Sequence, residues 1–488
     1  MLWTITSGPA VHGGEQPNVL FISIDDLRVE LNTYGQTWMH TPAIDALARE
    51  GVQFDRAYSQ MAICHPSRAS VLTGKRPESV GITTLRMAVR TAAPEVVTLP
   101  QHFRAHGYVA ESFGKVFHHG HGHRGDPESW SRRPHWFAGG VLYANPANLE
   151  HDRTNRAAAE ARRASGDTSD QPRHGPVTER HDDPEGVYMD TRMNAAAIRG
   201  LRRLAQGDQP FFLAVGYAKP HLPFNAPTPF WDLYDPAKIT LASQRTLPHG
   251  TPAIAGHDNG ELRSYAGVPR DGIVSTEQEI ELRHGYYACV SYVDALIGDL
   301  LAELDDLGLR DNTVVVLWSD HGFKLGDYGM WHKHTNFELD CRVPLIISAP
   351  GHRNGVRTPA IVELLDLYPT LCELAGLPVP SEVEGLSLTP TMTNPDTVIK
   401  PAAYSQHDRG KRIMGYSARS DRYRYTEWRI VETGQAVGVE LYDHLTDRGE
   451  TVNQSDNDSY AAAQAEMARL LAQGFPNSIA NWPAANRE

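Results

Sequence analysis

Short apolar runs recur along the chain, and each is followed by polar residues or glycine. The clearest runs span Asn18–Ile24, 108–113, 211–216, 313–318 and 344–348. Runs of this length without alternation are typical of strands that are buried on both faces of a sheet. Between them, helical spacing predicts one helix that Pro42 opens and Gly51 closes, and another over 286–306. Alternating strands and helices predict an α/β fold in which helices sandwich a mostly parallel sheet.

The pattern changes near residue 395. Beyond it, alternating residues over 413–417 and 422–428 predict a small antiparallel sheet, and a helical pattern begins at about Ala461. We therefore expect a large α/β domain over residues 1–395 and a smaller domain of antiparallel sheet plus helix over residues 396–488.

Residues 120–185 interrupt the large domain. They are rich in Arg, His, Asp, Gly and Pro and poor in apolar residues, which predicts a long surface insertion. Long segments of this kind are either solvated loops or functional loops beside a binding site. We favour the solvated loop, with the rim of a substrate pocket as the alternative.

Charge and cysteine content narrow the class of protein. The 488 residues carry a formal net charge of -13, which argues against a nucleic-acid binder or a membrane-surface protein. The four cysteines are scattered without paired spacing, so we expect no disulfide framework. There is no apolar run of the roughly 18 residues that a membrane helix needs, and no secretory signal pattern at the N-terminus. These features predict a cytoplasmic protein, or a periplasmic or secreted one if the N-terminus has been trimmed.

Polar side chains follow four of the predicted strands. The first strand ends in Asp25-Asp26, and another ends in Ser319-Asp320-His321; the remaining two lead to Lys115 and His118, and to Lys219 and His221. Ligands of open parallel sheets bind outside the carboxyl ends of the strands. We therefore expect these carboxylates, lysines and histidines to meet at one edge of the sheet.

A cation is expected where the carboxylates meet. Asp25, Asp26 and Asp320 would repel one another without one, and their hard oxygens suit Ca²⁺, Mg²⁺ or Mn²⁺. Helix capping or solvation in a loop is the alternative explanation of the Asp25-Asp26 pair. His321 is either a further metal ligand or a residue that binds substrate.

The segment Cys64-His65-Pro66-Ser67-Arg68 predicts a helix that begins at the cysteine. The helix N-terminus and Arg68 would attract anions and would lower the pKa of the Cys64 thiol. The segment therefore indicates an anion site that contains a nucleophile.

The same segment, C-x-P-S-R followed by T-G, resembles the signature of the type I sulfatases, in which the cysteine is converted to formylglycine after translation. The segments GKVFH, FFLAVGYAKPHLPF, SDHGFKLGDYG and IMGYSARSDRYRYTEW are similar to the iduronate-2-sulfatase-like branch of that family. The resemblance covers most of the chain outside 120–185. It implies an alkaline-phosphatase-like α/β domain followed by a smaller sheet domain.

The resemblance also implies the activity and the partners. The substrate would be a sulfate ester, as a small molecule or a saccharide, hydrolysed to an alcohol and inorganic sulfate after a formylglycine-generating enzyme has matured Cys64. The metal, usually Ca²⁺ in the family, would be held by Asp25, Asp26, Asp320, His321 and the modified Cys64. Arg68 would hold the formylglycine and the metal region, and Lys115, His118, His221 and Lys333 would surround the sulfate. These cations would form a local positive site that the net charge of the chain does not reveal.

The mechanism that follows from the resemblance begins with attack of the hydrated aldehyde on sulfur. His221, with Lys333, would protonate the leaving oxygen, and His118 would deprotonate the second hydroxyl so that sulfate is released. Two alternatives remain. The same site could hydrolyse phosphodiesters or phosphonate monoesters, or the protein could bind anionic glycans without hydrolysing them.

Overall fold

A seven-stranded sheet forms the centre of the molecule in the computed structural model, which describes residues 16–121, 123–136, 139–183, 186–352, 355–410 and 412–475. Four of its neighbouring pairs are parallel, and only the strand from Arg342 to Ser348 runs antiparallel to both of its neighbours. The predicted mostly parallel sheet is therefore confirmed. Its strands, in spatial order, are β13 (Val356–Glu363), β2 (Val52–Tyr58), β12 (Arg342–Ser348), β9 (Thr313–Ser319), β1 (Asn18–Ile24), β7 (Phe211–Tyr217) and β3 (Val109–Gly114).

The five strands predicted from apolar runs are all present, but β2 and β13 were missed. Both carry polar residues, because they lie toward one edge of the sheet and are covered less completely. Pro359 has no N–H to donate, and the pairing of β13 with β2 shifts register between Thr358 and Ile361. An edge strand of this kind lacks the continuous apolar run on which the sequence prediction depended.

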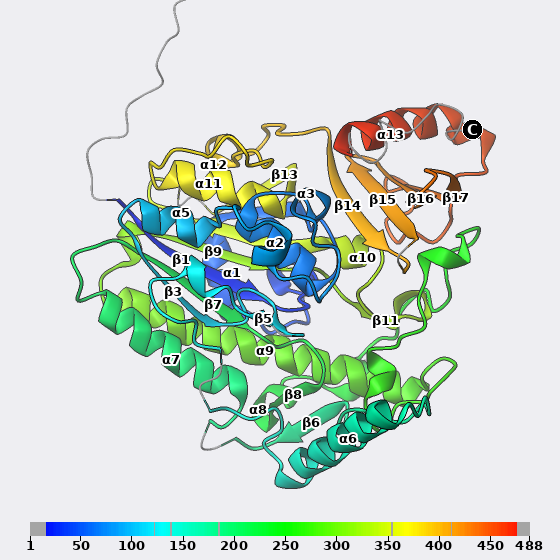
Figure 1. Cartoon of the computed structure of the whole chain (residues 1–488), viewed down its shortest axis with the longest axis horizontal. Helices are drawn as coiled ribbons and strands as arrows, with labels where there is room; N and C mark the ends of the chain where they lie inside the picture. Colours follow the sequence, from blue (N-terminus) through cyan, green and yellow to red (C-terminus); the bar gives the residue numbers. More distant parts are fainter. Residues whose placement is uncertain are drawn as a thin grey trace, which may run out of the picture.

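Helices cover both faces of the central sheet (Figure 1). Successive residues of β1 pack against opposite helical layers. Leu20 and Ile22 join one buried cluster with α1 (Pro42–Glu50), α7 (Met189–Leu204) and α9 (Thr276–Asp306). Val19 and Phe21 join a second cluster with α2 (Cys64–Thr73), α5 (Leu99–Ala105) and α11 (Leu367–Leu374). The apolar runs arise because both faces of the sheet are buried.

The two helices predicted between the apolar runs are present, and the second is longer than expected. α9 begins at Thr276, where Ser275 is the N-cap and accepts a hydrogen bond from the backbone N–H of Gln278 at 3.2 Å. Its first ten residues, TEQEIELRHG, are mostly polar, so their helical period was not visible in the sequence.

The prediction of a solvated loop over 120–185 was wrong. The segment contains the 20-residue helix α6 (Pro146–Ser165) and the strand β6 (Thr178–His181), which pairs in parallel with β8 (Phe224–Pro227). Asn145 caps the start of α6 and Gly166 ends it. Alanine, glutamate and arginine favour this helix through intrinsic propensity, while Asp152 is its only buried residue. An apolar stripe is therefore absent, and the periodicity gave no signal.

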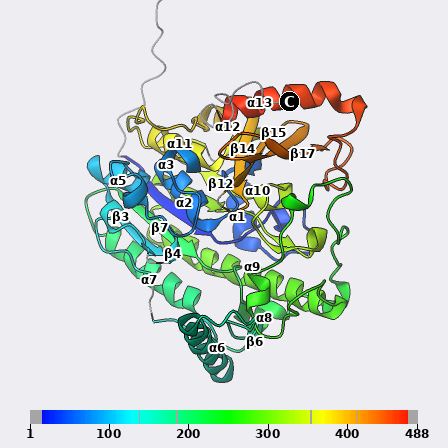
Figure 2. The ribbon, with the colours of Figure 1, turned by 45° about the vertical axis from the view of Figure 1, so that its right-hand side comes forward.

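The C-terminal part forms the predicted antiparallel sheet covered by a helix, at the end of the molecule opposite α6 (Figure 2). Tyr404, Tyr416 and Tyr425 pack between the sheet and the helix. The boundary near residue 395 stays a prediction, and 476–488 lie outside the described residues. The elements are β14 (Ala402–Asp408), β15 (Ile413–Ser420), β16 (Tyr423–Ile430), β17 (Ala436–Asp443) and α13 (Ala461–Gly474).

All four cysteines are free and buried, as the expected absence of a disulfide framework requires. Within the part of the chain that the structure describes, no helix has the length and apolar character to cross a membrane. Residues 1–15, from which the localisation was predicted, lie outside that part, so the localisation stays a prediction.

Candidate active site

Two parallel strand ends bring the predicted carboxylates together. Ile24, the last residue of β1, lies opposite Ser319, the last residue of β9, so Asp25 and Asp320 follow neighbouring strand ends. The backbone N–H of Asp26 donates to Asp320 Oδ1 at 3.2 Å. Asp26 has a φ of 61°, a left-handed conformation that is uncommon for residues other than glycine. This turn directs three buried carboxylates into one site, as the strand-end pattern predicted.

Cys64 is the first residue of α2, and it is buried at the same edge of the sheet. Its Sγ atom lies 3.4 Å from His321 Nε2 and 3.7 Å from Lys115 Nζ. The expected lowering of the thiol pKa was wrong. Burial, followed by the nearby Asp25 carboxylate, raises the pKa of the Cys64 thiol well above its usual value. An unmodified thiol in this position is therefore neutral and a poor nucleophile.

Arg68 lies one helical turn after Cys64 in α2 and contacts the segments that follow three strands. Its guanidinium donates to Asp320 Oδ2 at 2.8 Å, to Asp25 Oδ1 at 3.1 Å and to the carbonyl oxygen of Val116 at 3.1 Å. The side chain is fully buried, so these contacts are not weakened by solvent. Arg68 thereby fixes α2 against the ends of β1, β9 and β3.

Lys115 adds a second buried cation on the side of Asp25. Its ammonium group forms an ion pair with Asp25 Oδ2. Although burial favours the neutral acid, Lys115 and Arg68 outweigh it and hold the pKa of Asp25 well below its usual value. Asp25 is therefore ionised.

The chemistry of these donors fits a divalent cation. His321 Nδ1 donates to the carbonyl oxygen of Gly322 at 3.0 Å, which leaves the lone pair of Nε2 directed at the site. Nε2 is 3.5 Å from Asp26 Oδ1 and 3.7 Å from Asp320 Oδ2. Two sets of potential ligand atoms, each within 4.8 Å of one another, share Cys64: Asp25, Asp26, Cys64 and His221, and Cys64, Asp320 and His321. The predicted metal residues therefore lie together.

His221 and Lys333 face Asp26 from the other side. Lys333 Nζ lies 2.9 Å from Asp26 Oδ2 and 2.9 Å from Glu261 Oε2. His221 Nδ1 donates to the carbonyl oxygen of Leu222 at 2.7 Å, and its Nε2 lies 3.0 Å from Glu261 Oε1. Both partners of the His221 ring are acceptors, an arrangement that favours a proton on each ring nitrogen. A charged ring suits a proton donor better than a metal ligand.

The charges around His221 agree with this protonation state. Burial and Lys333 oppose the charged ring, but Asp26 and Glu261 outweigh them and raise the pKa of His221. Burial also opposes the charge of Glu261, yet Lys333 and His221 hold its pKa well below its usual value. The three side chains form one network of two cations and a carboxylate.

Glu261 was missed by the sequence analysis. It precedes the short helix Leu262–Ser264 in a loop, follows no apolar strand and belongs to none of the recognised motifs. The sequence analysis also missed the supporting roles of two helical residues, Tyr286 and Asp190. Tyr286 in α9 donates its hydroxyl to the carbonyl oxygen of Asp26 at 2.8 Å, and Asp190 in α7 accepts from the backbone N–H of Lys219 at 2.8 Å. These residues hold the loops that carry Asp26 and His221.

His118 lies beside His65, the residue after Cys64. Their ring centroids are 5.7 Å apart, and His118 Nε2 is 3.2 Å from His121 Nδ1. Burial, with the nearby Lys115, lowers the pKa of His118 far below its usual value. His118 is therefore neutral, as a proton acceptor must be.

A cleft of about 900 Å³ opens next to Cys64, toward the C-terminal sheet. Ile63 and His334, which adjoin Cys64 and Lys333 in the sequence, contribute to its wall. Its other lining residues come from three segments: 83–86, Gly256 to Asp258 and His407 to Gly410, together with His121. The cleft therefore borders the segments that carry Cys64 and Lys333.

Comparisons with known proteins agree with this geometry. Residues 17–377 match the sulfatase family model, and residues 326–475 match the model for the C-terminal region of N-sulphoglucosamine sulphohydrolase. The chain belongs to the sulfatase family, and it is a sulfuric ester hydrolase.

The chain is also similar to individual sulfatases over most of its length. The chain is 34% identical over 480 residues to iduronate 2-sulfatase of Mus musculus, with 84% of each chain covered. It is 25% identical over 480 residues to an arylsulfatase of Clostridium perfringens, covering 93% of this chain and 94% of the relative.

Solved structures show the alkaline-phosphatase-like fold that was predicted. A protein in complex with its substrate D-glucosamine-2-N,6-O-disulfate superposes with a TM-score of 0.74 at 22% identity, covering 96% of this chain and 99% of that one. A phosphonate monoester hydrolase from Silicibacter pomeroyi gives a TM-score of 0.73 at 24% identity, covering 96% of each chain.

Proposed function

We propose that this sulfatase hydrolyses a sulfate ester of a sugar, a uronate or another organic alcohol, using formylglycine made from Cys64 and a bound Ca²⁺, with Mg²⁺ or Mn²⁺ as alternatives. One observation carries the proposal. Cys64 begins α2 at the point where buried carboxylates, Arg68, Lys115 and His321 converge. Sulfatases generally use a metal ion and formylglycine, and the donor set here fits the metal ion.

When present, the cation would add positive charge at the sulfate oxygens, and the matured residue 64 would supply the attacking oxygen in place of the thiol sulfur. The side chains of the site then have separate tasks. Arg68 fixes the carboxylates that hold the cation, and Lys115 lies 3.7 Å from the side chain of residue 64. Lys115 and Lys333 offset the charge that develops on the sulfate oxygens.

The two histidines have opposite roles in proton transfer. His221 carries a proton at Nε2 and donates it to the leaving oxygen, which matters most for an aliphatic alcohol because an alkoxide leaves poorly. His118 is neutral and beside the residue that follows Cys64, so it accepts the proton when sulfate is released.

The relatives support a sulfated sugar as substrate. The mouse relative is named iduronate 2-sulfatase, and the structural neighbour binds a disulfated glucosamine. The positive charge of Lys115 and Lys333 at the site suits a tetrahedral anion. The cleft nearby is large enough for a sugar ring.

The test is mass spectrometry of the Cys64 peptide, on protein expressed together with a formylglycine-generating enzyme. We expect formylglycine at position 64 and hydrolysis of 4-nitrophenyl sulfate that is lost in Cys64→Ala. A wholly unmodified thiol in active enzyme would contradict the proposed nucleophile. Faster turnover of a phosphodiester or a phosphonate monoester than of the sulfate would favour the alternative activity, and binding of sulfated glycans without hydrolysis would favour a non-catalytic binding protein.

A further inference from the structure

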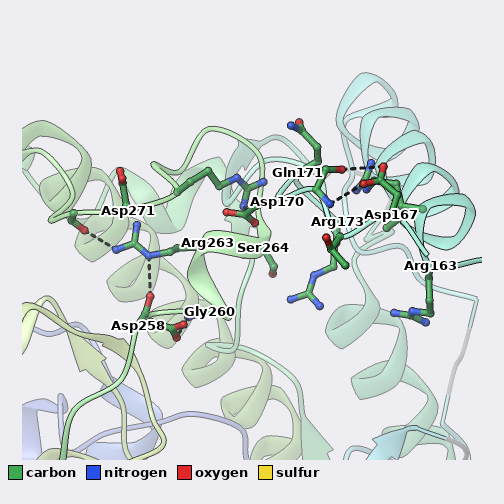
Figure 3. A pocket seen from close by; sticks show the side chains of 16 residues that line it. Arg163, Asp167, Asp170, Gln171, Arg173, Asp258, Gly260, Arg263, Ser264 and Asp271 are labelled. Carbon is green, nitrogen blue, oxygen red and sulfur yellow. Dashed lines mark hydrogen bonds and ion pairs between the residues drawn. The ribbon is translucent and has the colours of Figure 1, made fainter. Parts of the chain in front are cut away.

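A second cavity adjoins the loop that carries Glu261. Its volume is about 760 Å³, within the range of small-molecule sites. One wall is formed by the C-terminal end of α6 and the loop after it, and the other by the segment from Asp258 to Gly272 (Figure 3). Its lining residues include five arginines: Arg162, Arg163, Arg173, Arg263 and Arg270. We call it the arginine cavity.

The two walls are joined by backbone hydrogen bonds. The N–H groups of Arg173 and His174 donate to the carbonyl oxygen of Ser264 at 2.8 and 3.1 Å, and the N–H of Ala266 donates to Gly175 at 3.0 Å. These bonds fix the insertion against the loop before α9. The backbone of the two walls is therefore held together by the fold, while exposed side chains such as Arg163 and Arg173 line the space between them.

The arginines form few direct ion pairs. In the described part of the chain, their one carboxylate partner within 4.0 Å is Asp170, at 4.0 Å from Arg270 Nη1. Arg270 Nη2 is buried and has no hydrogen-bond partner there. Arg263 donates instead to the carbonyl oxygens of Asp258, Pro269 and Gly272, so its charge is retained. Guanidinium groups without carboxylate partners attract sulfate or carboxylate groups of a ligand.

Carboxylates are interspersed among the arginines. Asp167, Asp170, Asp258 and Asp271 line the same cavity, and Figure 3 shows Asp258 and Arg263 on one side and Arg163 and Arg173 on the other. Carboxylates accept hydrogen bonds from hydroxyl groups. The mixture therefore suits a ligand that carries both anionic groups and hydroxyls, which is the chemistry of a sulfated saccharide.

The arginine cavity and the catalytic site share one loop. Asp258 lines both the arginine cavity and the cleft beside Cys64. Gly260 lines the arginine cavity, and the next residue, Glu261, contacts His221 and Lys333. The backbone from Asp258 to Gly260 thus separates the arginine cavity from the cleft and from the Glu261 side chain.

We propose that the arginine cavity is a distal subsite that binds sulfate or carboxylate groups of an oligosaccharide whose terminal sulfate ester is hydrolysed at residue 64. The inference rests on the proposed function and gives it a substrate class: chains of several sulfated sugars rather than a single one. It also gives the insertion the role of a substrate rim, the alternative that was not favoured from the sequence.

The test uses the full-length mature enzyme and 4-nitrophenyl sulfate as reporter substrate. Heparin disaccharide and heparin hexasaccharide are compared as competitors of its hydrolysis. We expect the hexasaccharide to compete at least tenfold better in the parent enzyme. In Arg163→Gln/Arg173→Gln its apparent inhibition constant should rise about tenfold, since two exposed charge contacts are removed. The disaccharide constant and the kinetics of the reporter should stay unchanged.

Arg153→Gln/Arg199→Gln is the matched control, because it removes two exposed arginines that do not line the arginine cavity. Equal competition by the two heparin fragments, or equal losses in the two double variants, would overturn the distal subsite while reporter hydrolysis continues. Absence of reporter hydrolysis by enzyme that carries formylglycine would instead overturn the proposed sulfatase chemistry, and the subsite with it.

Discussion

Two histidines near Cys64 differ in protonation because their neighbours differ. His221 lies between a carbonyl and a carboxylate, so its charged form is stabilised. His118 is buried near Lys115, so its charged form is disfavoured. Environments that separate the pKa values of two groups in this way support the proposed roles of His221 as acid and His118 as base.

The general-acid role of His221 predicts a dependence on the leaving group. In His221→Ala, kcat/KM for a sugar or alkyl sulfate should fall by about 10²- to 10⁴-fold, the usual contribution of a general acid. The loss for 4-nitrophenyl sulfate should be far smaller, because nitrophenolate leaves without a proton. Steady-state kinetics on both substrates measure this, and equal losses would show that His221 does not act as the acid.

The contact of Glu261 with His221 predicts that a substitution of Glu261 changes the pH profile of kcat. The Glu261 carboxylate helps to raise the pKa of His221. If His221 is the general acid, as proposed, the active form is the protonated ring that exists below that pKa. Glu261→Gln should therefore move the alkaline limb of kcat for an alkyl sulfate to lower pH. Asp258→Asn removes a carboxylate from the same loop without touching His221, and its alkaline limb should not move. An unchanged limb in Glu261→Gln would refute this account.

At the scale of elements, the approach of β3 to β7 places Lys115. A Cβ atom added at Gly216 would lie 2.2 Å from the carbonyl carbon and oxygen of Lys115. Real Cβ contacts are not this short, so a side chain at Gly216 must displace the backbone that carries Lys115.

Gly216→Ala should therefore lower both stability and activity. We expect the free energy of unfolding to fall by about 1–3 kcal/mol, the usual cost of overpacking, and kcat to fall as Lys115 moves from Asp25. Gly207→Ala is the control, since the nearest atom to its added Cβ, the carbonyl oxygen of Leu204, is at 3.4 Å. Urea unfolding and reporter kinetics measure both effects. If the two variants had similar free energies of unfolding, the backbone at Lys115 would be able to move aside without a loss of stability.

Across the whole molecule, buried ion pairs join the C-terminal sheet to the large α/β part. Glu338, in α10 (Glu338–Cys341), accepts from Arg424 Nη2 at 2.6 Å and from Arg419 Nε at 3.0 Å. Both arginines are buried in the small sheet. Although burial opposes its charge, Arg419 and other cations hold the pKa of Glu338 well below its usual value.

Removing this carboxylate should destabilise the protein strongly. In Glu338→Gln, two buried arginines lose a charged partner, and the free energy of unfolding should fall by about 3 kcal/mol. A depressed carboxyl pKa contributes stability above the unfolded value near pH ~4.3, and that contribution is lost as the pH falls further. Thermal unfolding should show a large gap between wild type and variant at pH 7 that narrows in acid. Glu150→Gln is the control, because Glu150 forms an exposed pair with Arg153, and it should change the free energy of unfolding little. If the difference in stability between wild type and Glu338→Gln widened in acid, the role of Glu338 would be contradicted.

The sequence by itself determined the central strands and the residues at their ends. Asn18–Ile24 is apolar throughout because both of its faces are buried, and Asp25 follows because the carboxyl ends of parallel strands are open to ligand. These are local properties, so a run of residues reveals them. The motif around Cys64 revealed the family in the same way.

Only the tertiary structure decided what surrounds these residues. Glu261 comes from a loop without a pattern, and it acts because folding brings it to His221 and Lys333. The pKa of Cys64 is raised because burial and the Asp25 carboxylate outweigh the nearby cations. Neither the burial of the thiol nor its distance from Asp25 can be read from the sequence. The helix α6 was also not predictable from an apolar stripe. It is stabilised by its capping residues and by the helix propensity of its residues, and its faces are mostly exposed. The pKa and the burial of a side chain depend on all the groups that surround it in space. The sequence shows directly only which residues are adjacent along the chain.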